Sequence, residues 1–123
     1  MNPTPLYSSV CAGSPSPIDD WQDFDLAEHL VRHPQDTFYV RVSGHSMTEA
    51  GINDGDLLIV DRTVEPRPSD VVVAQCGDGF TVKRFQRENG HLRLVPTNPN
   101  YRPIEPGEEA RICGVAVFTI HKL

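Results

Sequence analysis

Long apolar runs, clustered basic residues and metal-binding cysteine patterns are all missing from this sequence of 123 residues. No apolar stretch approaches the ~20 residues that a membrane-spanning helix needs. The first residues also lack the basic start and the apolar stretch of a signal peptide. We therefore expect a cytoplasmic protein with no association with a membrane.

Positive charge is scarce and unevenly distributed. The net charge is −6 at pH 7, and residues 1–36 hold one basic side chain, Arg32, against six acidic ones. The other residues hold ten basic and eleven acidic side chains. Because contacts with nucleic acid phosphates need clustered lysine and arginine, we do not expect this chain to bind nucleic acid directly.

Cysteine is also sparse. Cys11, Cys76 and Cys113 are an odd number and lack the spacing of metal ligands. The five histidines are scattered, and none pairs with a cysteine at the spacing of a zinc finger. The sequence predicts buried free thiols and no metal site.

The sequence does contain many short strand patterns separated by turns, which predicts a mainly β fold. Eleven prolines and nine glycines favour short strands and turns over long helices. A hairpin around Gly77–Gly79 is expected, and the last strand should place Val115, Val117 and Thr119 on one face. The expected strands are 38–42, 57–60, 71–74, 80–85, 91–95 and 111–121, with a long loop over 96–106.

The first 24 residues are expected to form an arm, followed by a β domain over residues 25–123. Four prolines and four serines interrupt regular structure in the arm. Its run of apolar and small residues, Val10–Gly13, could lie in a groove as an added strand. A plain disordered tail would have the same composition.

A short helix is predicted directly after the arm. Asp25 is a good N-cap residue, and Glu28 three positions later resembles a capping box. Leu26 and Leu30 lie one turn apart and could face a core. Pro34 is expected to end the helix.

Ser46 is the first candidate catalytic residue. The segment 43–47, Ser-Gly-His-Ser-Met, follows the first strand of the β domain and can form a tight turn that lifts a hydroxyl out of the sheet. Such a serine is a nucleophile if a base removes its proton, although an ordinary turn serine would look the same. His45 is not expected to be that base, because neighbouring residues in an extended chain point to opposite faces.

Lys83 is the second candidate. Lys83 and Arg84 alternate along a strand, so a sheet that is covered on both faces would partly bury one of them. Burial lowers the pKa of a lysine and makes it a usable general base. The alternative is a lysine whose stem packs while its ammonium group reaches water.

The ordered set of motifs resembles the LexA/UmuD family of self-cleaving serine–lysine peptidases, and its UmuD-type members most closely. The resemblance covers nearly the whole chain and includes the interval of 37 residues between Ser46 and Lys83. It implies a LexA- and signal-peptidase-like fold of twisted antiparallel β-sheets with short helices and an extended N-terminal arm. The matching segments are 44–47, 51–61, 80–83, 96–104 and 114–115.

The resemblance also implies roles for individual residues. Ser46 matches the nucleophile, Lys83 matches the general base, and the bond between Ala12 and Gly13 matches the self-cleavage site. Cys11 stands one position earlier than in the UmuD-type pattern, so cleavage between Cys11 and Ala12 is the alternative. The general geometry of such turns makes the backbone N–H of Ser46 a candidate oxyanion donor. No cofactor is implied.

A UmuD-type resemblance implies a homodimer of the SOS response in the bacterial cytoplasm. Its self-cleavage would be stimulated by RecA filaments on single-stranded DNA, and the trimmed product would join a UmuC-like Y-family polymerase in translesion synthesis. The twelve residues ahead of Gly13 are too few for the helix-turn-helix domain of a LexA-type repressor, and the anchor of a signal peptidase is absent. The alternatives are a non-catalytic interaction module of the same fold, a relative of the C-terminal domain of LexA repressors, and a peptidase that acts on other proteins.

Overall fold

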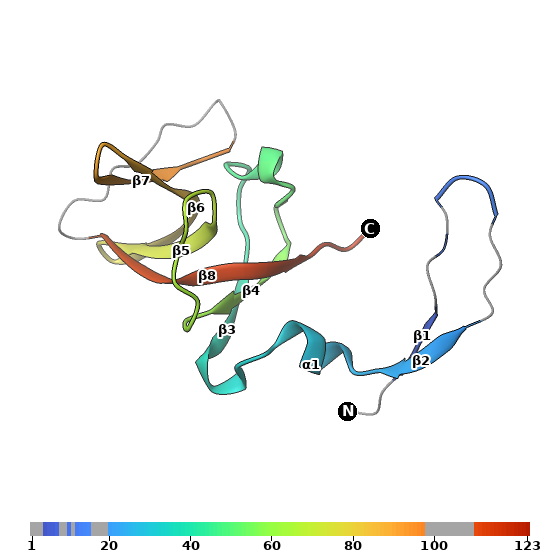
Figure 1. Cartoon of the computed structure of the whole chain (residues 1–123). Helices are drawn as coiled ribbons and strands as arrows, with labels where there is room; N and C mark the ends of the chain where they lie inside the picture. The colour runs from blue at the N-terminus through green and yellow to red at the C-terminus, as the bar shows by residue number, and fades with distance from the viewer. Residues whose placement is uncertain (1–3, 8–9, 11, 16–19, 98–109) are drawn as a thin grey trace. The chain divides into compact units, whose positions relative to one another are not determined.

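The computed structural model describes residues 4–7, 10, 12–15, 20–97 and 110–123 (Figure 1). The chain divides into two compact units, Met1–Arg32 and His33–Leu123. This boundary follows the short helix, whereas the sequence predicted it before the helix, at residue 25. Among the described residues, no helix has the length and apolar composition needed to cross a membrane.

The first unit contains a two-stranded antiparallel ladder. Strand β1 (Thr4–Tyr7) pairs with β2 (Trp21–Phe24), with Thr4 opposite Phe24. The prediction that prolines exclude regular structure from the arm is therefore wrong. Both strands are edge strands in a two-stranded ladder, and an edge strand tolerates a proline such as Pro5. Ala12 and Gly13 lie between the two strands in sequence, and both are exposed.

Helix α1 (Leu26–Leu30) follows β2 and begins as predicted. The Asp25 side chain accepts a hydrogen bond from the backbone N–H of Glu28 at 3.2 Å. The helix ends at Leu30, and Pro34 instead begins the 3₁₀ helix η1 (Pro34–Asp36). No residue of α1 is buried, and Leu26 is 52% exposed. The expected packing of Leu26 and Leu30 into a core is absent, because five residues form barely more than one turn.

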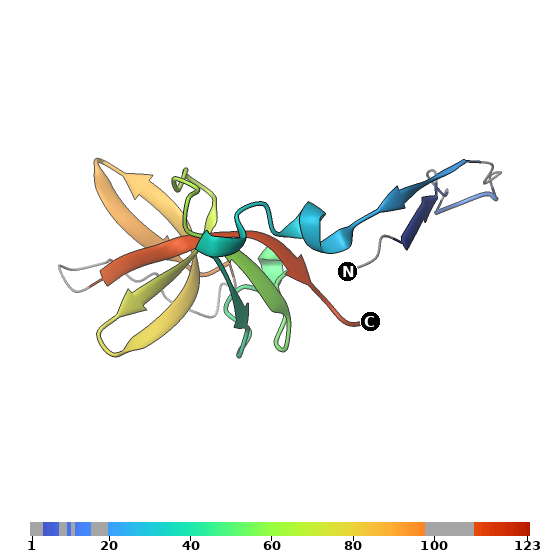
Figure 2. The same ribbon diagram turned by 90° about the horizontal axis from the view of Figure 1, so that it is seen from below.

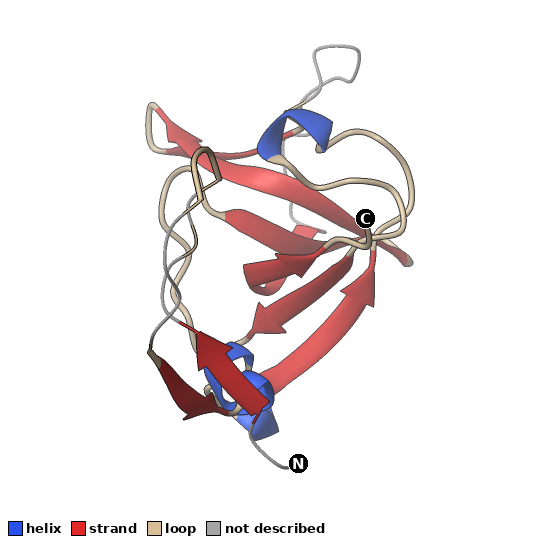
Figure 3. Ribbon diagram, turned by 90° about the vertical axis from the view of Figure 1, so that its right-hand side faces the viewer, coloured by secondary structure: helices blue, strands red, loops and turns tan. Residues whose placement is uncertain are grey.

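The second unit is built on one antiparallel sheet of six strands, with the order β3-β4-β8-β5-β6-β7. The strands twist and fan out on both sides of β8 (Figures 2 and 3). All six predicted strands are present, which confirms the mainly β fold, whereas most of the predicted loop after Pro96 lies outside the described residues. The strands are β3 (Thr37–Arg41), β4 (Leu57–Asp61), β5 (Val71–Cys76), β6 (Gly79–Glu88), β7 (His91–Val95) and β8 (Ala110–Ile120), and the 3₁₀ helix η2 (Thr48–Ala50) lies between β3 and β4.

Strand β8 is central because it pairs with β5 along its first half and with β4 along its second half. Its register shifts twice, so that Cys113 and Val117 each have no cross-strand partner in these ladders. The second bulge overturns the prediction of a common face for Val115, Val117 and Thr119: Val115 is 4% exposed and Val117 is 39% exposed. A bulge inserts one residue and so interrupts the strict alternation of a strand.

Two apolar clusters cover the two faces of β5. Val73 belongs to one cluster, together with residues of the segment between β3 and β4. Val72 and Ala74 belong to the other. Since adjacent residues of a strand point to opposite faces, the middle of the sheet is covered on both sides. The first cluster is Val42, Met47, Ile52, Leu58, Val60 and Val73, and the second is Val72, Ala74, Phe85, Leu94 and Val115.

The close approach of β4 and β8 depends on Gly114. A Cβ atom built on Gly114 would lie 2.7 Å from Val60 Cγ1 and 3.1 Å from the carbonyl oxygen of Asp61. We expect Gly114→Ala to lower the free energy of unfolding by about 1–3 kcal/mol, as overpacking of a core does. Urea denaturation measures this loss. Gly79→Ala is the matched control, because its Cβ would meet no atom closer than 3.9 Å. Equal losses in the two variants would contradict the assignment.

Candidate active site

The turn that carries Ser46 is held at its base by hydrogen bonds between the ends of β3 and β4. The backbone N–H of Val42 donates to the carbonyl of Asp56, and that of Gly55 donates to the carbonyl of Val42, both at 2.8 Å. Gly44 has a φ of 100°, which favours glycine, and its N–H donates to the Asp54 side chain at 2.7 Å. This local structure fixes where the following serine lies.

Met47, the residue that follows Ser46, anchors the turn in the apolar core. Its side chain is 2% exposed and belongs to the first apolar cluster. Directly after it, η2 begins, and the N–H groups of Ala50 and Ile52 donate to the Met47 carbonyl at 3.1 and 3.2 Å. A buried residue immediately after Ser46 leaves the serine little freedom to move.

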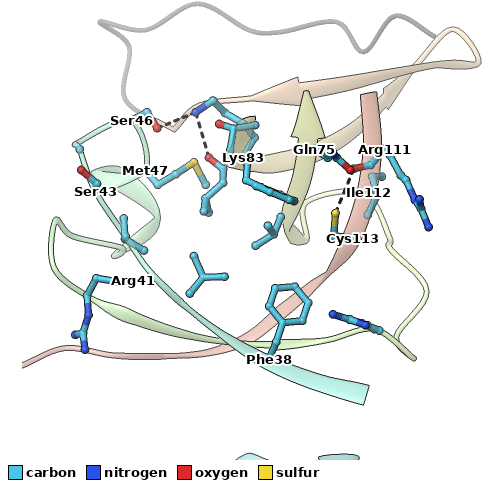
Figure 4. A pocket seen from close by; sticks show the side chains of 18 residues that line it. Phe38, Arg41, Ser43, Ser46, Met47, Gln75, Lys83, Arg111, Ile112 and Cys113 are labelled. Atoms are coloured by element: carbon cyan, nitrogen blue, oxygen red, sulfur yellow. Dashed lines mark hydrogen bonds between the residues drawn. The ribbon is translucent and has the colours of Figure 1, made fainter. Parts of the chain in front are cut away.

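Lys83 reaches Ser46 from β6. Its Nζ donates a hydrogen bond to Ser46 Oγ at 3.0 Å and a second to the carbonyl of Val82 at 3.2 Å (Figure 4). Lys83 is 8% exposed, so its amine is buried rather than extended into water. The structure thus brings together the two residues that the sequence analysis paired.

Burial dominates the electrostatics of Lys83. Removal of the amine from water lowers the pKa of Lys83 below the ordinary value of 10.5, and the nearby Cys76 has a smaller effect in the opposite direction. No ion pair joins Lys83 to a carboxylate within the described part of the chain. A lysine that becomes neutral at a lower pH has a lone pair available to accept the proton of a neighbouring hydroxyl.

A cleft of about 780 Å³ opens beside the pair. Figure 4 shows Ser46 and Lys83 at one end of the cleft and Phe38 at the other. Its basic lining residues besides Lys83 are Arg41, Arg62 and Arg111, and none of its described lining residues is acidic. Arg62 stacks over the Phe38 ring at 4.9 Å. An apolar floor with a basic rim suits a neutral or acidic peptide segment.

The other residues singled out from the sequence lie as follows. Ala12 and Gly13 belong to the first unit and are exposed, whereas Cys11 lies outside the described residues. His45 is exposed. Within the described part of the chain, no acceptor takes a hydrogen bond from the backbone N–H of Ser46.

The described thiols and histidines form no metal site. Cys76 and Cys113 are free and half-buried, so the expectation of buried free thiols holds only in part for these two. Among the described residues, no group of three histidine, cysteine or acidic side chains could hold a metal ion.

Thr97 is a site residue that the sequence analysis missed. Its backbone N–H donates to the carbonyl of Ser46 at 2.9 Å, and its hydroxyl accepts from the N–H of Ala50 at 3.1 Å. Thr97 lies in segment 96–104, which matches the family, but that match assigned no role to the threonine. Local periodicity does not reveal its contacts, because 50 residues separate Thr97 from the turn at 43–47.

Asp56 stabilises the end of the same turn through the hydrogen bonds of its side chain. Its carboxylate is 1% exposed and accepts hydrogen bonds from the Asn53 N–H at 2.9 Å, the Thr119 hydroxyl at 3.2 Å and His121 Nδ1 at 2.6 Å. The hydrogen bond from Asn53 lowers the pKa of Asp56 most, and His121 and Thr119 lower it further against the opposing effect of burial. An ionised carboxylate thus ties the end of the turn to the last strand.

Known proteins are similar to this chain over most of its length. The family described as peptidase S24-like matches residues 5–117. Protein SamA of Salmonella typhimurium is 42% identical over 121 residues, which cover 96% of this chain and 85% of SamA. Protein ImpA of Escherichia coli is 41% identical over 122 residues, which cover 96% of this chain and 83% of ImpA. The LexA repressor of Paracidovorax citrulli is 42% identical over 120 residues, which cover 94% of this chain but 53% of the repressor.

Because the pKa of Asp56 is lowered, the difference in stability between wild type and an Asp56→Asn variant should depend on pH. The ionised carboxylate stabilises the fold above its ordinary pKa of 3.8, and this contribution is lost as the pH falls through the lower pKa of the folded state. Asp56→Asn should therefore be less stable than wild type at neutral pH, and the difference should shrink in acid.

Urea denaturation at several pH values measures this difference. Asp78→Asn makes the same chemical change at an exposed residue of the β5–β6 turn and serves as the control. A difference between wild type and Asp56→Asn that stays constant down to strongly acidic pH would contradict the prediction.

Proposed function

This chain belongs to the peptidase S24-like family, and from that premise we propose that it is a UmuD-like protein of the SOS response that cleaves its own arm between Ala12 and Gly13. The observation that carries the proposal is the 3.0 Å hydrogen bond from the buried Lys83 amine to the Ser46 hydroxyl beside a cleft. A buried lysine next to a turn serine is an arrangement that activates a nucleophile.

The proposed reaction begins with the neutral form of Lys83. Nζ takes the proton of Ser46 Oγ as the oxygen attacks the carbonyl carbon of Ala12, and the backbone N–H of Ser46 donates to the developing oxyanion. The protonated Lys83 then gives its proton to the departing amine of Gly13, which leaves residues 1–12 as an ester on Ser46. A water molecule, deprotonated by Lys83, hydrolyses this ester and restores the hydroxyl.

The composition of the arm supports its role as the substrate. Ala12 and Gly13 are small, so the backbone at this bond can enter a cleft without clashes of side chains. Both residues are exposed, and 33 residues separate Gly13 from Ser46. Main-chain hydrogen bonds would hold the segment as an extended strand beside Ser46, on its own subunit or on a partner subunit. Asp19 and Asp20 downstream of the bond are compatible with a cleft whose described lining is basic and not acidic.

The partners that we propose rest on the family resemblance. A UmuD-like protein acts as a homodimer in the cytoplasm, its cleavage is stimulated by RecA filaments on single-stranded DNA, and its trimmed form is an accessory subunit of a UmuC-like Y-family polymerase. Loss of the arm would change the exposed surface, which is a physical basis for a change of partners. A non-catalytic interaction module of the same fold is the competing function, and it predicts that no cleavage occurs.

Replacement of either residue of the pair should abolish self-cleavage. In wild type, incubation at alkaline pH or with an activated RecA filament should produce a fragment of 111 residues, from Gly13 to Leu123, which mass spectrometry detects. Ser46→Ala and Lys83→Ala should yield no fragment, because the first lacks the nucleophile and the second lacks the base. Lys122→Ala, a change at an exposed lysine that does not line the cleft, should cleave like wild type.

The position of the cut is tested in the same experiment. Gly13→Glu should block the fragment without unfolding the domain, since a bulky side chain beside the bond obstructs entry into the cleft. Asn2→Glu adds the same charge near the start of the arm and should not block it. Equal cleavage in wild type and Gly13→Glu, or a cut at any bond other than Ala12–Gly13, would remove this assignment.

The rate of cleavage should depend on pH in one direction only. Because burial lowers the pKa of Lys83, the rate should rise with pH, reach half its maximum below pH 10.5 and then level off when the amine is neutral. Rates measured from about pH 6 to 11 define the midpoint of this pH dependence. This range spans the ordinary pKa values of histidine and lysine. A bell-shaped profile centred near pH 7 would instead implicate a histidine, and His45 would be the first one to replace.

A further inference from the structure

Thr97 holds the nucleophile's turn at two points. Its N–H donates to the carbonyl of Ser46 at 2.9 Å, and its hydroxyl oxygen accepts from the N–H of Ala50 at 3.1 Å. The Ala50 N–H is shared, because it also donates to the carbonyl of Met47 at 3.1 Å. One residue from a distant part of the chain therefore contacts the start and the end of segment 46–50.

The same hairpin that carries Lys83 carries Thr97. In the pairing of β6 with β7, Arg84 lies opposite Val95. Continued by one residue on each strand, this antiparallel register places Lys83 beside Pro96 at the open end of the hairpin. Pro96 is buried, and its ring fixes its own φ, which gives Thr97 a rigid attachment.

Three hydrogen bonds thus join the turn at 46–50 to one rigid element: Lys83 to Ser46, Thr97 to Ser46, and Ala50 to Thr97. The first aligns the reacting groups, and the other two fix the backbone from which the serine projects. Without the two Thr97 contacts, Lys83 would make the remaining one of these three hydrogen bonds, through a long side chain that has many rotamers. The apolar cluster that contains Met47 packs against Val82 of the same hairpin, but such packing does not fix the direction of the Ser46 backbone.

We propose that Thr97 is a positioning residue of the serine–lysine pair, which holds Ser46 Oγ against Lys83 Nζ by fixing the backbone at Ser46 and Ala50. The effect on cleavage rests on the proposed function, whereas the effect on the geometry of the pair does not. Errors of about 1 Å in the placement of reacting groups reduce enzymatic rates by about 100-fold. Loss of one of the two contacts should have a smaller effect.

Two variants of Thr97 distinguish the contribution of its hydroxyl group from that of its side-chain shape. Thr97→Val keeps the branched side chain and removes the acceptor for the Ala50 N–H. Thr97→Ser keeps the hydroxyl and is the matched control. In the full-length chain we expect Thr97→Val to lower the rate constant of self-cleavage about tenfold and Thr97→Ser to change it less than about twofold, as expected for partial misplacement of the serine. Thermal unfolding verifies that both variants remain folded.

A second measurement does not depend on cleavage. Nuclear magnetic resonance can titrate Nζ of Lys83 in the Gly13→Glu background, in which the arm is retained. A loosened turn admits water to the amine, so Thr97→Val should raise the pKa of Lys83 toward its ordinary value and Thr97→Ser should not. Cys76 is the titratable neighbour that acts on this amine, and it is unchanged in both variants. A role limited to stability would leave this pKa unchanged.

The outcomes distinguish this inference from the proposed function. If wild type does not cleave itself, the proposed function fails, and the titration alone decides the role of Thr97. If wild type cleaves but Thr97→Val has the same rate and the same pKa of Lys83 as Thr97→Ser, the positioning role is overturned while the proposed function stands.

Discussion

The buried amine of Lys83 is the constraint on which the candidate active site of the second unit depends. A lysine removed from water is costly unless its hydrogen bonds are satisfied or it loses its charge. Here two acceptors, Ser46 Oγ and the Val82 carbonyl, lie within hydrogen-bond distance, and no described carboxylate pairs with the amine. The same burial that costs stability also lowers the pKa of Lys83, and a lowered pKa is what the proposed role of this lysine as a general base requires.

The rest of the unit keeps that amine and its serine in place. Strand β8 joins the two halves of the sheet, and the absence of a side chain at Gly114 lets it lie close to β4. The carboxylate of Asp56 ties the end of the Ser46 turn to Thr119 and His121 at the end of the chain. Residues far apart in sequence therefore contact one turn: Lys83 on β6, Thr97 after β7, and Thr119 on β8 through Asp56.

Sequence patterns predicted the features that depend on neighbouring residues. The six strands and the Asp25 N-cap follow from alternation and from capping chemistry. The pairing of Ser46 with Lys83, which are 37 residues apart, was instead implied by the resemblance to the LexA/UmuD family. The β1–β2 ladder was missed because the prolines in the arm were taken to exclude it, although an edge strand tolerates proline. The exposed Val117 and the contacts of Thr97 were missed because a bulge and a long-range hydrogen bond depend on tertiary pairing, which local periodicity does not contain.

The location of the proposed cleavage bond gives the cut a structural consequence beyond the loss of twelve residues. Strand β1 lies before Ala12 and β2 lies after Gly13, so hydrolysis between them would remove the covalent connection and leave the two strands held by their non-covalent pairing. A two-stranded ladder is marginally stable even when a turn connects its strands, and both of these strands are largely exposed. Release of β1 would then free the edge of β2, where Trp21 is already 57% exposed. Cleavage at this bond would therefore change which backbone groups of β2 are paired as well as shorten the chain.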